Sequence, residues 1–589
     1  MEVTRLFDLL DHYLEKFPKQ EVALSCKRNG VWRNFSIQEY IEITNNLSYG
    51  MMKLGIKPGD RVGIVSGNRP EWNFIDFAAM QIGAISTPIY PTISQDDYRY
   101  ILNHAEMKII FIEGKDLHRK LEPILPEVKN LEHVYTFDDL GDGKYEYLDQ
   151  LIELGKQNQQ SDKLNELKIS AGEFDVATMI YTSGTTGNPK GVMLTHSNIV
   201  NNFKNVAHTP AKWSNKALSF LPICHAYERM LVYLYHYLGM SVYYAENLGT
   251  IADNMKELRP TMMTCVPRLL EKIYDKLYAT GKKQKGIQQR IYFWAFNLAT
   301  KYKNYDRTWL YNQQHKLADK LIYSKWREAL GATNFDIVVS GGSAIMPHIA
   351  AFFSAIGMPV YEGYGLSETS PVIAVSQRGR NGRKAGTVGP PLPGVEVILG
   401  EHDEILCRGH NVMKGYYKDP ELTAQVIDKL GWFHTGDTGK FTVEGLLVIT
   451  GRLKSIFKTS FGKYVNPQML ESKFSESPFI DNLIVLGENQ KFAAALIVPD
   501  FAHLKIWAEQ KAIKYTNSEE MIENPEVLKL YKAEVDKYNK HFGDYEQIKR
   551  YQLLPDEWTQ QNGVLSPTLK IKRNVIEEKY KDRIEKLFQ

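Results

Sequence analysis

The chain has 589 residues, of which 43% are hydrophobic and 24% are charged, and its formal net charge is +3. This length exceeds what one small core can organise, so we expect two or more domains. The composition excludes fibrous and disordered proteins, and the near balance of charge argues against nucleic acid as a partner.

The four cysteines predict a reducing compartment. They lie far apart and form no Cys-x-x-Cys pair, which argues against a disulfide scaffold or a structural zinc site. The first residues include an acid and lack the apolar segment of a signal peptide. No uninterrupted apolar run reaches the roughly 18 residues of a membrane span. We therefore expect a cytoplasmic protein, with peripheral contact at the inner membrane surface left open.

Short apolar runs typical of strands alternate with helical stretches along most of the chain. This alternation favours an α/β fold with layered helices and largely parallel strands. The clearest runs are residues 61–66, 108–113, 176–180, 240–245, 262–266 and 335–340.

A loop rich in glycine and hydroxyl groups, residues 181–191, lies between the run at 176–180 and a capped helix start at 195–200. Glycines let backbone N–H groups approach phosphate oxygens, and Lys190 supplies a cation. Pro189 and Gly191 stand where a Walker A loop has Gly and Ser/Thr, so we expect polyphosphate binding without ordinary P-loop hydrolysis. The residues expected at the phosphates are Thr182, Ser183, Gly184, Thr185, Thr186, Gly187 and Lys190.

Residues 271–330 form a helical, aromatic and basic stretch. Two interpretations stay open: a surface for a membrane or an acidic partner, and a solvated helical excursion from the main domain. Its clustered basic residues are Lys282, Lys283, Lys285, Arg290, Lys301, Lys303 and Arg307.

Two glycine-containing turns after strand-like runs offer a surface for a nucleotide, because ligands bind at the carboxyl ends of strands in open α/β sheets. In the second turn, Tyr364 offers a ring for base stacking, Glu368 a hard oxygen ligand for Mg²⁺, and Thr369 a donor to phosphate. The other residues expected near the nucleotide are Gly341, Gly342 and Ser343 of the first turn, and Glu362, Gly363 and Gly365 of the second.

From residue 386 to 450, short β-rich runs predict a small antiparallel sheet or barrel, and a mixed α+β tail follows. Asp437 is a carboxylate suited to both ribose hydroxyls, and Arg452, fifteen positions later, to the same sugar or a phosphate. Lys570 follows a proline turn near the C-terminus. Taken singly, the segment 361–369 also fits a structural turn, Asp437 a turn residue and Lys570 a basic tail.

Together these segments resemble the adenylate-forming (AMP-binding) superfamily, and specifically its long-chain fatty acid–CoA ligase branch. The resemblance covers nearly the whole chain. The branch is indicated by His225-Ala-Tyr-Glu-Arg229, the helical insertion after Arg268, and residues 568–573. Other matching segments are Ser66-Gly-Asn-Arg-Pro-Glu-Trp72, Pro88-Ile-Tyr-Pro91, Tyr364-Gly-Leu-Ser-Glu-Thr369, Gly431-Trp-Phe-His-Thr-Gly-Asp437, Gly451-Arg-Leu-Lys454 and Gly462-Lys-Tyr-Val-Asn-Pro467.

The resemblance implies ligation of a long-chain fatty acid to coenzyme A through an acyl-AMP, with ATP as co-substrate and Mg²⁺ as cofactor. It implies a large domain over 1–451, with a helical insertion at about 271–330, and a small mobile α+β domain over 452–589. Thr185 and Glu368 would place Mg²⁺, and the 182–190 loop would hold the β- and γ-phosphates. Tyr364 would stack on adenine, while Thr369 would touch the α-phosphate.

By the same resemblance, Asp437 and Arg452 would bind the ribose and His225 would lie beside the fatty carboxylate. Lys570 would bridge that carboxylate and the α-phosphate. Lys454 would be the hinge about which the small domain swings between the two half-reactions, and Gly462 would line a pantetheine channel.

Two departures and several alternatives remain. Gly451 and Lys454 stand where some members carry acids, and Lys572 lies two residues from Lys570, so both would point the same way in an extended segment. The aromatic stretch 227–244 suits either an acyl tunnel or a packed core. The alternatives to the ligase are a fatty acyl-AMP ligase, a CoA ligase for another acid, a luciferase-type oxygenase and a non-catalytic nucleotide- or acyl-binding protein. The chain is expected to be a monomer or a homodimer.

Overall fold

The computed structural model describes residues 2–141, 143–182, 188–247, 249–379, 381–461, 463–559, 561–565 and 571–589, and only the backbone of Lys454. The chain divides into two compact units. The first comprises Met1–Ile398, Leu406–His434 and Phe441–Leu447. The second comprises Leu399–Ile405, Thr435–Lys440 and Val448–Gln589.

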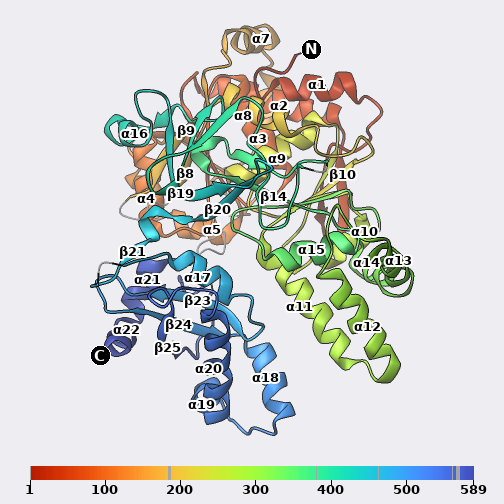
Figure 1. Cartoon of the computed structure of the whole chain (residues 1–589). Coiled ribbons are helices and arrows are strands. Elements are labelled where there is room, and N and C mark those ends of the chain that lie inside the picture. Colours follow the sequence, from red (N-terminus) through yellow and green to blue (C-terminus); the bar gives the residue numbers. More distant parts are fainter. Residues whose placement is uncertain are drawn as a thin grey trace. The chain divides into compact units, whose positions relative to one another are not determined.

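The first unit contains two eight-stranded sheets, and one of them has the order β18-β9-β8-β4-β3-β5-β6-β7 (Figure 1). Strands β8, β4, β3, β5, β6 and β7 pair in parallel, whereas β9 and β18 are antiparallel at one edge. The strands are β3 (Arg61–Val65), β4 (Ile85–Ile89), β5 (Met107–Ile112), β6 (His133–Thr136), β7 (Glu146–Tyr147), β8 (Val176–Thr182), β9 (Lys190–Thr195) and β18 (Gly415–Tyr416).

The other sheet of the first unit has the order β15-β14-β13-β12-β10-β11-β1-β2. Its inner pairs are parallel, and antiparallel pairs β14/β15 and β1/β2 close its two edges. The strands are β1 (Leu24–Arg28), β2 (Val31–Phe35), β10 (Lys216–Ser219), β11 (Ser241–Tyr244), β12 (Met262–Cys265), β13 (Ile337–Ser340), β14 (Val360–Gly365) and β15 (Val372–Val375). The predicted layered α/β fold with largely parallel strands is confirmed.

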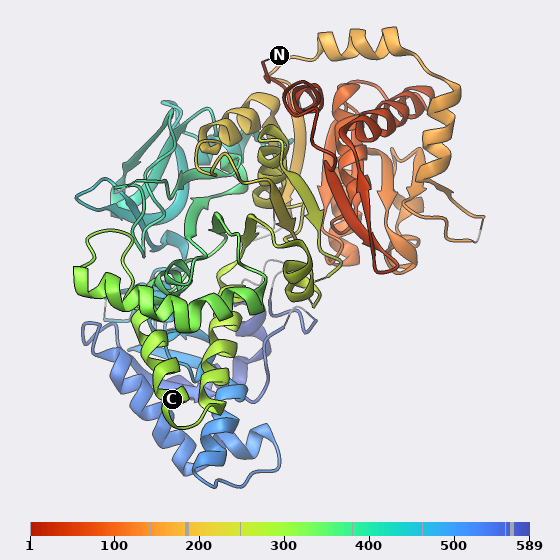
Figure 2. The same cartoon turned by 90° about the vertical axis from the view of Figure 1, so that its right-hand side faces the viewer.

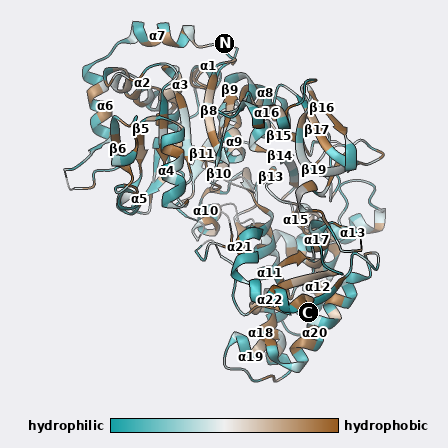
Figure 3. Cartoon of the chain, turned by 90° about the vertical axis from the view of Figure 1, so that its left-hand side faces the viewer, coloured by the Kyte–Doolittle hydropathy of each residue, from teal (hydrophilic) through white to brown (hydrophobic). Residues whose placement is uncertain are grey.

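Helices cover these sheets. They are α1 (Asp8–Lys16), α2 (Ile37–Lys53), α3 (Pro70–Gln81), α4 (Gln95–His104), α5 (Gly114–Leu121), α6 (Leu148–Gln157), α7 (Ser161–Ser170), α8 (His196–Val206), α9 (Ala226–Tyr237), α10 (Ile251–Leu258), α11 (Pro267–Lys283), α12 (Gly286–Ala299), α13 (Trp309–Ala318), α14 (Ser324–Leu330), α15 (Pro347–Ala355) and α16 (Pro420–Val426). Short turns of 3₁₀ or π type are η1 (Leu125–Glu127), η2 (Asp319–Tyr323) and η3 (Ser367–Thr369). In Figure 3, β8 is largely hydrophobic in colour, whereas α5 and α16 are mostly hydrophilic.

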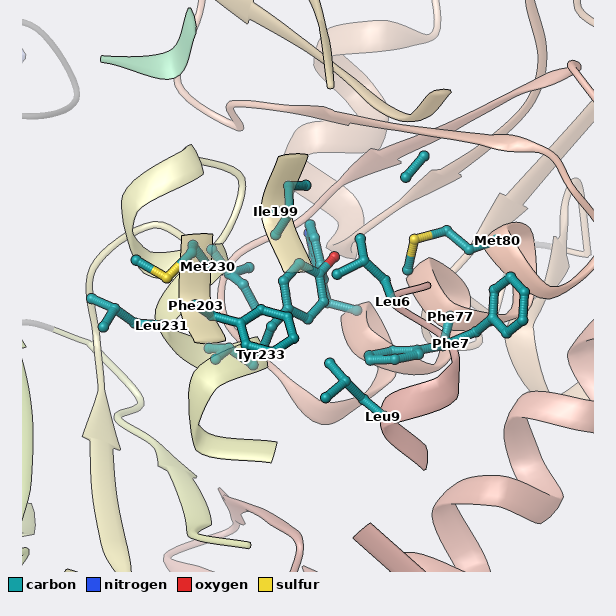
Figure 4. Packing of buried hydrophobic residues seen from close by; sticks show 14 of the residues in the cluster. Leu6, Phe7, Leu9, Phe77, Met80, Ile199, Phe203, Met230, Leu231 and Tyr233 are labelled. Carbon is teal, nitrogen blue, oxygen red and sulfur yellow. The ribbon is translucent and has the colours of Figure 1, made fainter. Parts of the chain in front are cut away.

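The core of the first unit is built where the chain start meets α3, α8 and α9. Figure 4 shows Leu6, Phe7 and Leu9 beside side chains of these three helices. All of them are buried, and Tyr233 of α9 lies among them. Helix α9 is therefore anchored in the core along most of its length, which fixes the position of its first turn.

A four-stranded sheet of order β16-β17-β19-β20 forms the β-rich segment predicted for residues 386–450. Its strands are β16 (Val395–Leu399), β17 (Glu404–Gly409), β19 (Phe433–Phe441) and β20 (Leu447–Arg452), and η4 (Glu401–Asp403) joins the first two. The division between the two units passes through this sheet, since β17 and β19 each contribute residues to both units.

The second unit is organised by a three-stranded sheet of order β23-β24-β25 and a two-stranded pair, β21 and β22. Every residue of β24 is buried: alternate residues pack with α17, α18 and α20 on one face and with α21 and α22 on the other. The elements are η5 (Leu453–Ser455), β21 (Phe457–Lys458), β22 (Tyr464–Val465), α17 (Pro467–Phe474), β23 (Ile480–Leu486), β24 (Ala493–Pro499), α18 (Phe501–Gln510), α19 (Ser518–Glu523), α20 (Pro525–Asn539), β25 (Ile548–Leu553), α21 (Arg573–Lys579) and α22 (Lys581–Phe588).

Two local expectations need correction. A strand, β9, lies between the predicted phosphate loop and α8, so the loop joins an antiparallel hairpin and Lys190 begins β9. Tyr364 lies inside β14 rather than in a turn after a strand, because β14 continues to Gly365. The capped helix start is confirmed: Thr195 and Asn198 form a capping box on α8.

None of the described helices is both long and apolar enough to cross a membrane.

Candidate active site

Lys190, Tyr416 and Glu368 come together where β9 pairs with β18. The Lys190 ammonium lies 5.4 Å from the centre of the Tyr416 ring, a cation–π distance. The Tyr416 hydroxyl donates a hydrogen bond of 2.9 Å to Oε1 of Glu368. Burial, and then the neighbouring carboxylate, raise the pKa of Tyr416, so its hydroxyl remains a donor at all physiological pH values. A cation, a phenol and a carboxylate thus form one chain of contacts.

The backbone holds Glu368 in this position. Glu368 lies in the short turn η3, and its carbonyl accepts from the N–H of Met413 at 2.8 Å. Ser370, two residues on, donates through its hydroxyl to the carbonyl of Asn411 at 2.8 Å. The segment that carries Tyr416 is therefore fastened to the turn that carries Glu368. These bonds hold the carboxylate and the phenol in fixed positions relative to each other.

The residues fit Mg²⁺ held mainly by a bound polyphosphate. Mg²⁺ takes oxygen ligands in an octahedron and is commonly bound by one or two carboxylates together with phosphates and waters. Glu368 can supply such a carboxylate oxygen. Among the described residues no group of three His, Cys, Asp or Glu is arranged as a protein cage for a metal. Thr185, the second predicted metal residue, lies outside the described residues.

The predicted phosphate loop is described only at its two ends. Ser183, Gly184, Thr185, Thr186 and Gly187 lie outside the described residues. Thr182 and Lys190 are register partners at the end of the β8/β9 pair. The hairpin therefore brings the two ends of the loop together, and one of them carries the cation next to Tyr416.

The predicted glycine turn after β13 contacts the first turn of α9. Gly342 has a φ of +85°, a conformation that favours glycine, and Ser343 is exposed. A Cβ at Gly341 would lie 2.9 Å from the Tyr227 ring. Tyr227 in turn donates from its hydroxyl to the carbonyl of Val339 at 3.1 Å. Glycine at 341 therefore lets the backbone lie flat against an aromatic ring.

Strand β14 places the predicted adenine residues beside β15. Gly363 and Tyr364 pair with Val375 and Ala374, and a bulge follows Tyr364. A Cβ at Gly365 would lie 1.8 Å from the carbonyl oxygen of Pro371, so only glycine fits there. The Tyr364 ring is half-buried, which leaves part of it accessible to a ligand.

Burial changes the chemistry of two predicted nucleotide residues, Glu362 and Thr369. Burial raises the pKa of Glu362 to about 8, although an N–H from Gly386 partly opposes it, so this carboxyl is mostly neutral at pH 7. Thr369 is fully buried, and its hydroxyl lies 2.5 Å from the carbonyl of Pro371 and accepts from the N–H of Leu366 at 2.9 Å. Thr369 therefore stabilises the η3 turn, and a phosphate contact would require its hydroxyl to leave these partners.

His225 is the N-cap of α9. Its Nδ1 accepts from the N–H of Tyr227 at 3.1 Å, which places the imidazole proton on Nε2 in the neutral ring. The Tyr90 ring lies edge-on to His225 with centres 6.3 Å apart. The orientation of His225 thus depends on the first turn of α9.

Two buried ionisable side chains fasten that turn to both sheets. Glu228 accepts from the hydroxyl of Ser219 on β10 at 2.6 Å and from the hydroxyl of Thr264 on β12. Arg229 pairs with Asp76 of α3 and donates to Thr178 of β8 at 2.5 Å. Because unpaired buried charges are costly, these partners leave the turn little freedom. Tyr416 is a contributor that no quoted motif contains, whereas Tyr227 and Glu228 belong to the 225–229 motif but were given no role there.

Glu228 should make stability depend on pH. Burial raises its pKa to about 7, against partial compensation by Ser219 and Thr264. The unfolded carboxyl ionises near 4.5, so the folded state binds more protons between these values and stability falls as pH rises from about 4.5 to about 7. Glu228→Gln removes this loss. Its unfolding free energy relative to wild type should therefore rise by about 3 kcal/mol between pH 4.5 and pH 8.

Urea unfolding of both proteins at several pH values, followed by tryptophan fluorescence, measures this difference. A stability difference that stays constant from pH 4.5 to pH 8 would show that Glu228 is ionised to the same extent in the folded and unfolded states.

In the second unit, Asp437 and Arg452 form the predicted pair. Nε of Arg452 donates to the nearly buried Asp437 carboxylate at 2.7 Å. A Cβ at Gly451 would lie 2.3 Å from Nδ2 of Asn466, which donates to the carbonyl of Thr450 at 3.2 Å. Asn466 therefore fills the space that an acid at 451 would need. Lys454 lies in η5, where only its backbone is described, while Gly462 and Lys570 lie outside the described residues.

Comparisons with known proteins identify relatives of this chain. Residues 10–417 match the family model described as AMP-binding enzyme, and residues 455–589 match the AMP-binding enzyme C-terminal domain. The chain is 33% identical over 568 residues to the long-chain-fatty-acid–CoA ligase FadD15 of Mycobacterium bovis, covering 95% of this chain and 93% of the relative. It is 31% identical to the peroxisomal long chain acyl-CoA synthetase 7 of Arabidopsis thaliana, covering 100% and 87%.

Solved structures share the fold at lower identity. The adenylation domain of a carboxylate reductase from Mycobacterium chelonae has a TM-score of 0.77 at 20% identity, covering 99% of this chain and 91% of that chain. The anthranilate CoA ligase AuaEII in complex with anthranoyl-AMP has a TM-score of 0.73 at 17% identity, covering 98% of each. From the family matches across both halves of the sequence, the chain belongs to the AMP-binding enzyme family.

Proposed function

We propose that the protein ligates a long-chain fatty acid to coenzyme A through an acyl-AMP, consuming ATP and releasing AMP and pyrophosphate. The observation that carries this proposal is the contact chain from Lys190 through Tyr416 to Glu368, because it joins a cation at one end of the predicted phosphate loop to a carboxylate of the kind that binds Mg²⁺. Relatives named as long-chain-fatty-acid–CoA ligases support the choice of acid and thiol.

The first half-reaction brings a fatty carboxylate against a polyanion. Attack of a carboxylate oxygen on the α-phosphorus forms the acyl-AMP and expels pyrophosphate, so negative charge must be neutralised as it moves to the leaving group. Lys190 would contact the β- and γ-phosphates together with residues 182–187. Mg²⁺, held by Glu368 and Thr185, would supply further positive charge to the phosphates. Tyr416 orients Glu368 for this task.

The remaining residues would position the substrates. Tyr364 would lie against adenine, with Gly341, Gly342 and Ser343 forming the flat backbone beside it. His225, neutral with its proton on Nε2, would donate to the fatty carboxylate without adding a charge. We propose that Asp437 and Arg452 bind the ribose and that Lys570 bridges the carboxylate and the α-phosphate. The fully buried Thr369 would support η3 rather than touch the phosphate.

The second half-reaction is a displacement of AMP by the thiol of coenzyme A. A free thiol has a pKa near 8.5, so a small fraction is thiolate at neutral pH, and the adenylate supplies a good leaving group. We propose that residues 452–589 form a mobile domain that pivots at Lys454, withdrawing Lys570 and bringing Gly462 to the pantetheine. We also propose a cytoplasmic location, which suits four cysteines that are all free and buried.

Pyrophosphate and AMP release should be measured with acids from acetate to oleate, each with and without coenzyme A. The proposal expects release that rises with chain length and AMP formation that requires coenzyme A. Pyrophosphate release followed by stable acyl-AMP in the presence of coenzyme A would instead identify a fatty acyl-AMP ligase. A preference for short or aromatic acids would reject the long-chain assignment, and no release with any acid would favour a binding protein.

A further inference from the structure

The helical segment α11–α14 has a larger net positive charge than the whole chain. Between residues 267 and 330 there are 14 Lys and Arg but five Asp and Glu, a net charge of +9. The whole chain has a net charge of +3, so the rest of the sequence is net negative. Such a concentration of one sign creates a local field that attracts anionic partners.

This segment projects from the sheet that contains β12 and β13. Figures 1 and 2 show α11 and α12 as a helical pair that extends away from the sheet, with α13 and α14 near its base. Tyr311 of α13 donates to the carbonyl of Leu298 on α12 at 2.8 Å, and Tyr323 to that of Ala295 at 2.7 Å. The inner side of α13 and η2 is thereby fastened to α12, so the opposite side faces solvent.

The outward side of α13 and η2 carries large apolar side chains beside the polar Gln313 and the lysines that a solvated helix would have. Trp309, Leu310, Leu317 and Leu321 are 74%, 60%, 52% and 37% exposed. The three leucines are separated by seven and four residues, which keeps them on one helical face. The inner side of this segment already packs into the core through the buried residues Ala318, Tyr323 and Trp326. The exposed leucines therefore do not contribute to that core.

Lysines alternate with these apolar side chains. Lys316 and Lys320 are exposed beside this apolar stripe, and neither forms an ion pair with any described residue. The nearby acids are neutralised: Asp319 pairs with Arg327 at 2.6 Å, and Glu328 with Arg259 at 2.7 Å. An apolar stripe with flanking unpaired lysines is typical of helices that lie in a membrane interface, because lysine stems bury while their charges reach the headgroups.

We propose that the α13 face, formed by Trp309, Leu310, Lys316, Leu317, Lys320 and Leu321, docks onto an anionic lipid surface. The proposal rests on the proposed function, because a long-chain fatty acid partitions into bilayers and a docked enzyme meets it there. The positive charge of the segment favours a bilayer over a second copy of the chain as the partner of this face. A symmetric contact with a second copy would bring two segments of net +9 together, whereas an anionic bilayer complements them.

The test is co-sedimentation of the full chain with vesicles of phosphatidylcholine alone and of phosphatidylcholine with phosphatidylglycerol. Wild type should bind the anionic vesicles and be released by salt. Leu310→Ser/Leu317→Ser/Leu321→Ser should reduce binding at least tenfold, since it removes the inserted side chains. Lys316→Glu/Lys320→Glu should also weaken it, by about fivefold for each unit of charge at the surface.

Two control variants carry matched changes elsewhere: Ile398→Ser/Leu430→Ser/Val443→Ser, at exposed apolar residues of the first unit, and Lys511→Glu/Lys529→Glu in the second. Both should bind as wild type. Equal binding to both vesicle types, or equal loss in test and control variants, would overturn the proposal. A wild-type dimer in light scattering that the leucine variant converts to monomer would assign the face to a second copy instead.

Activity with decanoate in the absence of vesicles separates this proposal from the enzymatic one. All four variants should ligate this dispersed acid at the wild-type rate, because the α13 face contains none of the proposed substrate-binding residues. Loss of vesicle binding with retained decanoate activity supports docking. If wild type binds anionic vesicles but ligates no acid, the proposed function fails while the docking surface stands.

Discussion

Replacing Glu368 with glutamine should slow pyrophosphate release by about 100- to 1,000-fold while leaving the fold intact. The amide keeps the volume and can still accept from the Tyr416 hydroxyl, but it loses the charge that a metal-bound polyphosphate requires. The measurement is a coupled pyrophosphate assay at saturating ATP and fatty acid over a range of Mg²⁺ concentrations. The apparent Mg²⁺ requirement should rise together with the fall in rate.

Tyr416→Phe separates orientation from charge. It retains the ring 5.4 Å from the Lys190 ammonium and removes the hydrogen bond to Glu368, so its rate should fall by about tenfold, less than for Glu368→Gln. Glu444→Gln is the control, because Glu444 is a carboxylate of the same unit that pairs with Lys384. A Glu368→Gln enzyme as fast as the Glu444→Gln enzyme would remove Glu368 from the proposed site.

Lys570→Ala should abolish adenylation and spare thioester formation. The lysine is proposed to neutralise charge on the carboxylate and the α-phosphate only while they react, so acyl-AMP supplied from outside bypasses its role. Two assays measure the halves of the reaction: pyrophosphate release from ATP and fatty acid, and acyl-CoA formation from synthetic acyl-AMP and coenzyme A. We expect a loss of at least 1,000-fold in the first assay and less than about tenfold in the second.

Lys572→Ala is the matched control for this pair of assays. Lys572 is exposed, lies two residues from Lys570, and is the N-cap of α21 with its N–H donating to the carbonyl of Val564 at 2.9 Å. Its replacement should leave both half-reactions near wild type. Normal fatty acid activation by Lys570→Ala, or a larger loss in Lys572→Ala, would transfer the assignment to Lys572 or to another cation.

The layered fold was predictable because parallel strands buried on both faces appear as short apolar runs. Residues 61–66, 108–113, 262–266 and 335–340 all correspond to observed strands. Strand β9 was not predicted. Its residues 190–195 continue a glycine-rich loop, and only pairing with β8 makes them a strand. The loop itself was recognised by residue types, yet its position in a hairpin was not.

Site residues could be predicted from the sequence only where a single segment contains a recognisable motif. Glu368 and Lys190 were both predicted, but no local signal pointed to Tyr416, which lies 48 residues from the carboxylate that it orients. Thr369 shows the opposite case. Its residue type suggests a phosphate donor, whereas complete burial directs its hydroxyl to the backbone of its own turn.

By itself the sequence determined the alternation of strands and helices, the family, and the residue types expected at the phosphates, the nucleotide and the transferred carboxylate. These properties are local, since periodicity and motif order need no knowledge of distant neighbours. Tertiary structure alone decided which side chains meet. It joined Lys190 to Glu368 through Tyr416, set the burial that raises the pKa of Glu228 and Glu362, and filled the space beside Gly451 with Asn466. Contacts and solvation depend on segments far apart in the chain, and they are fixed only when the core packs.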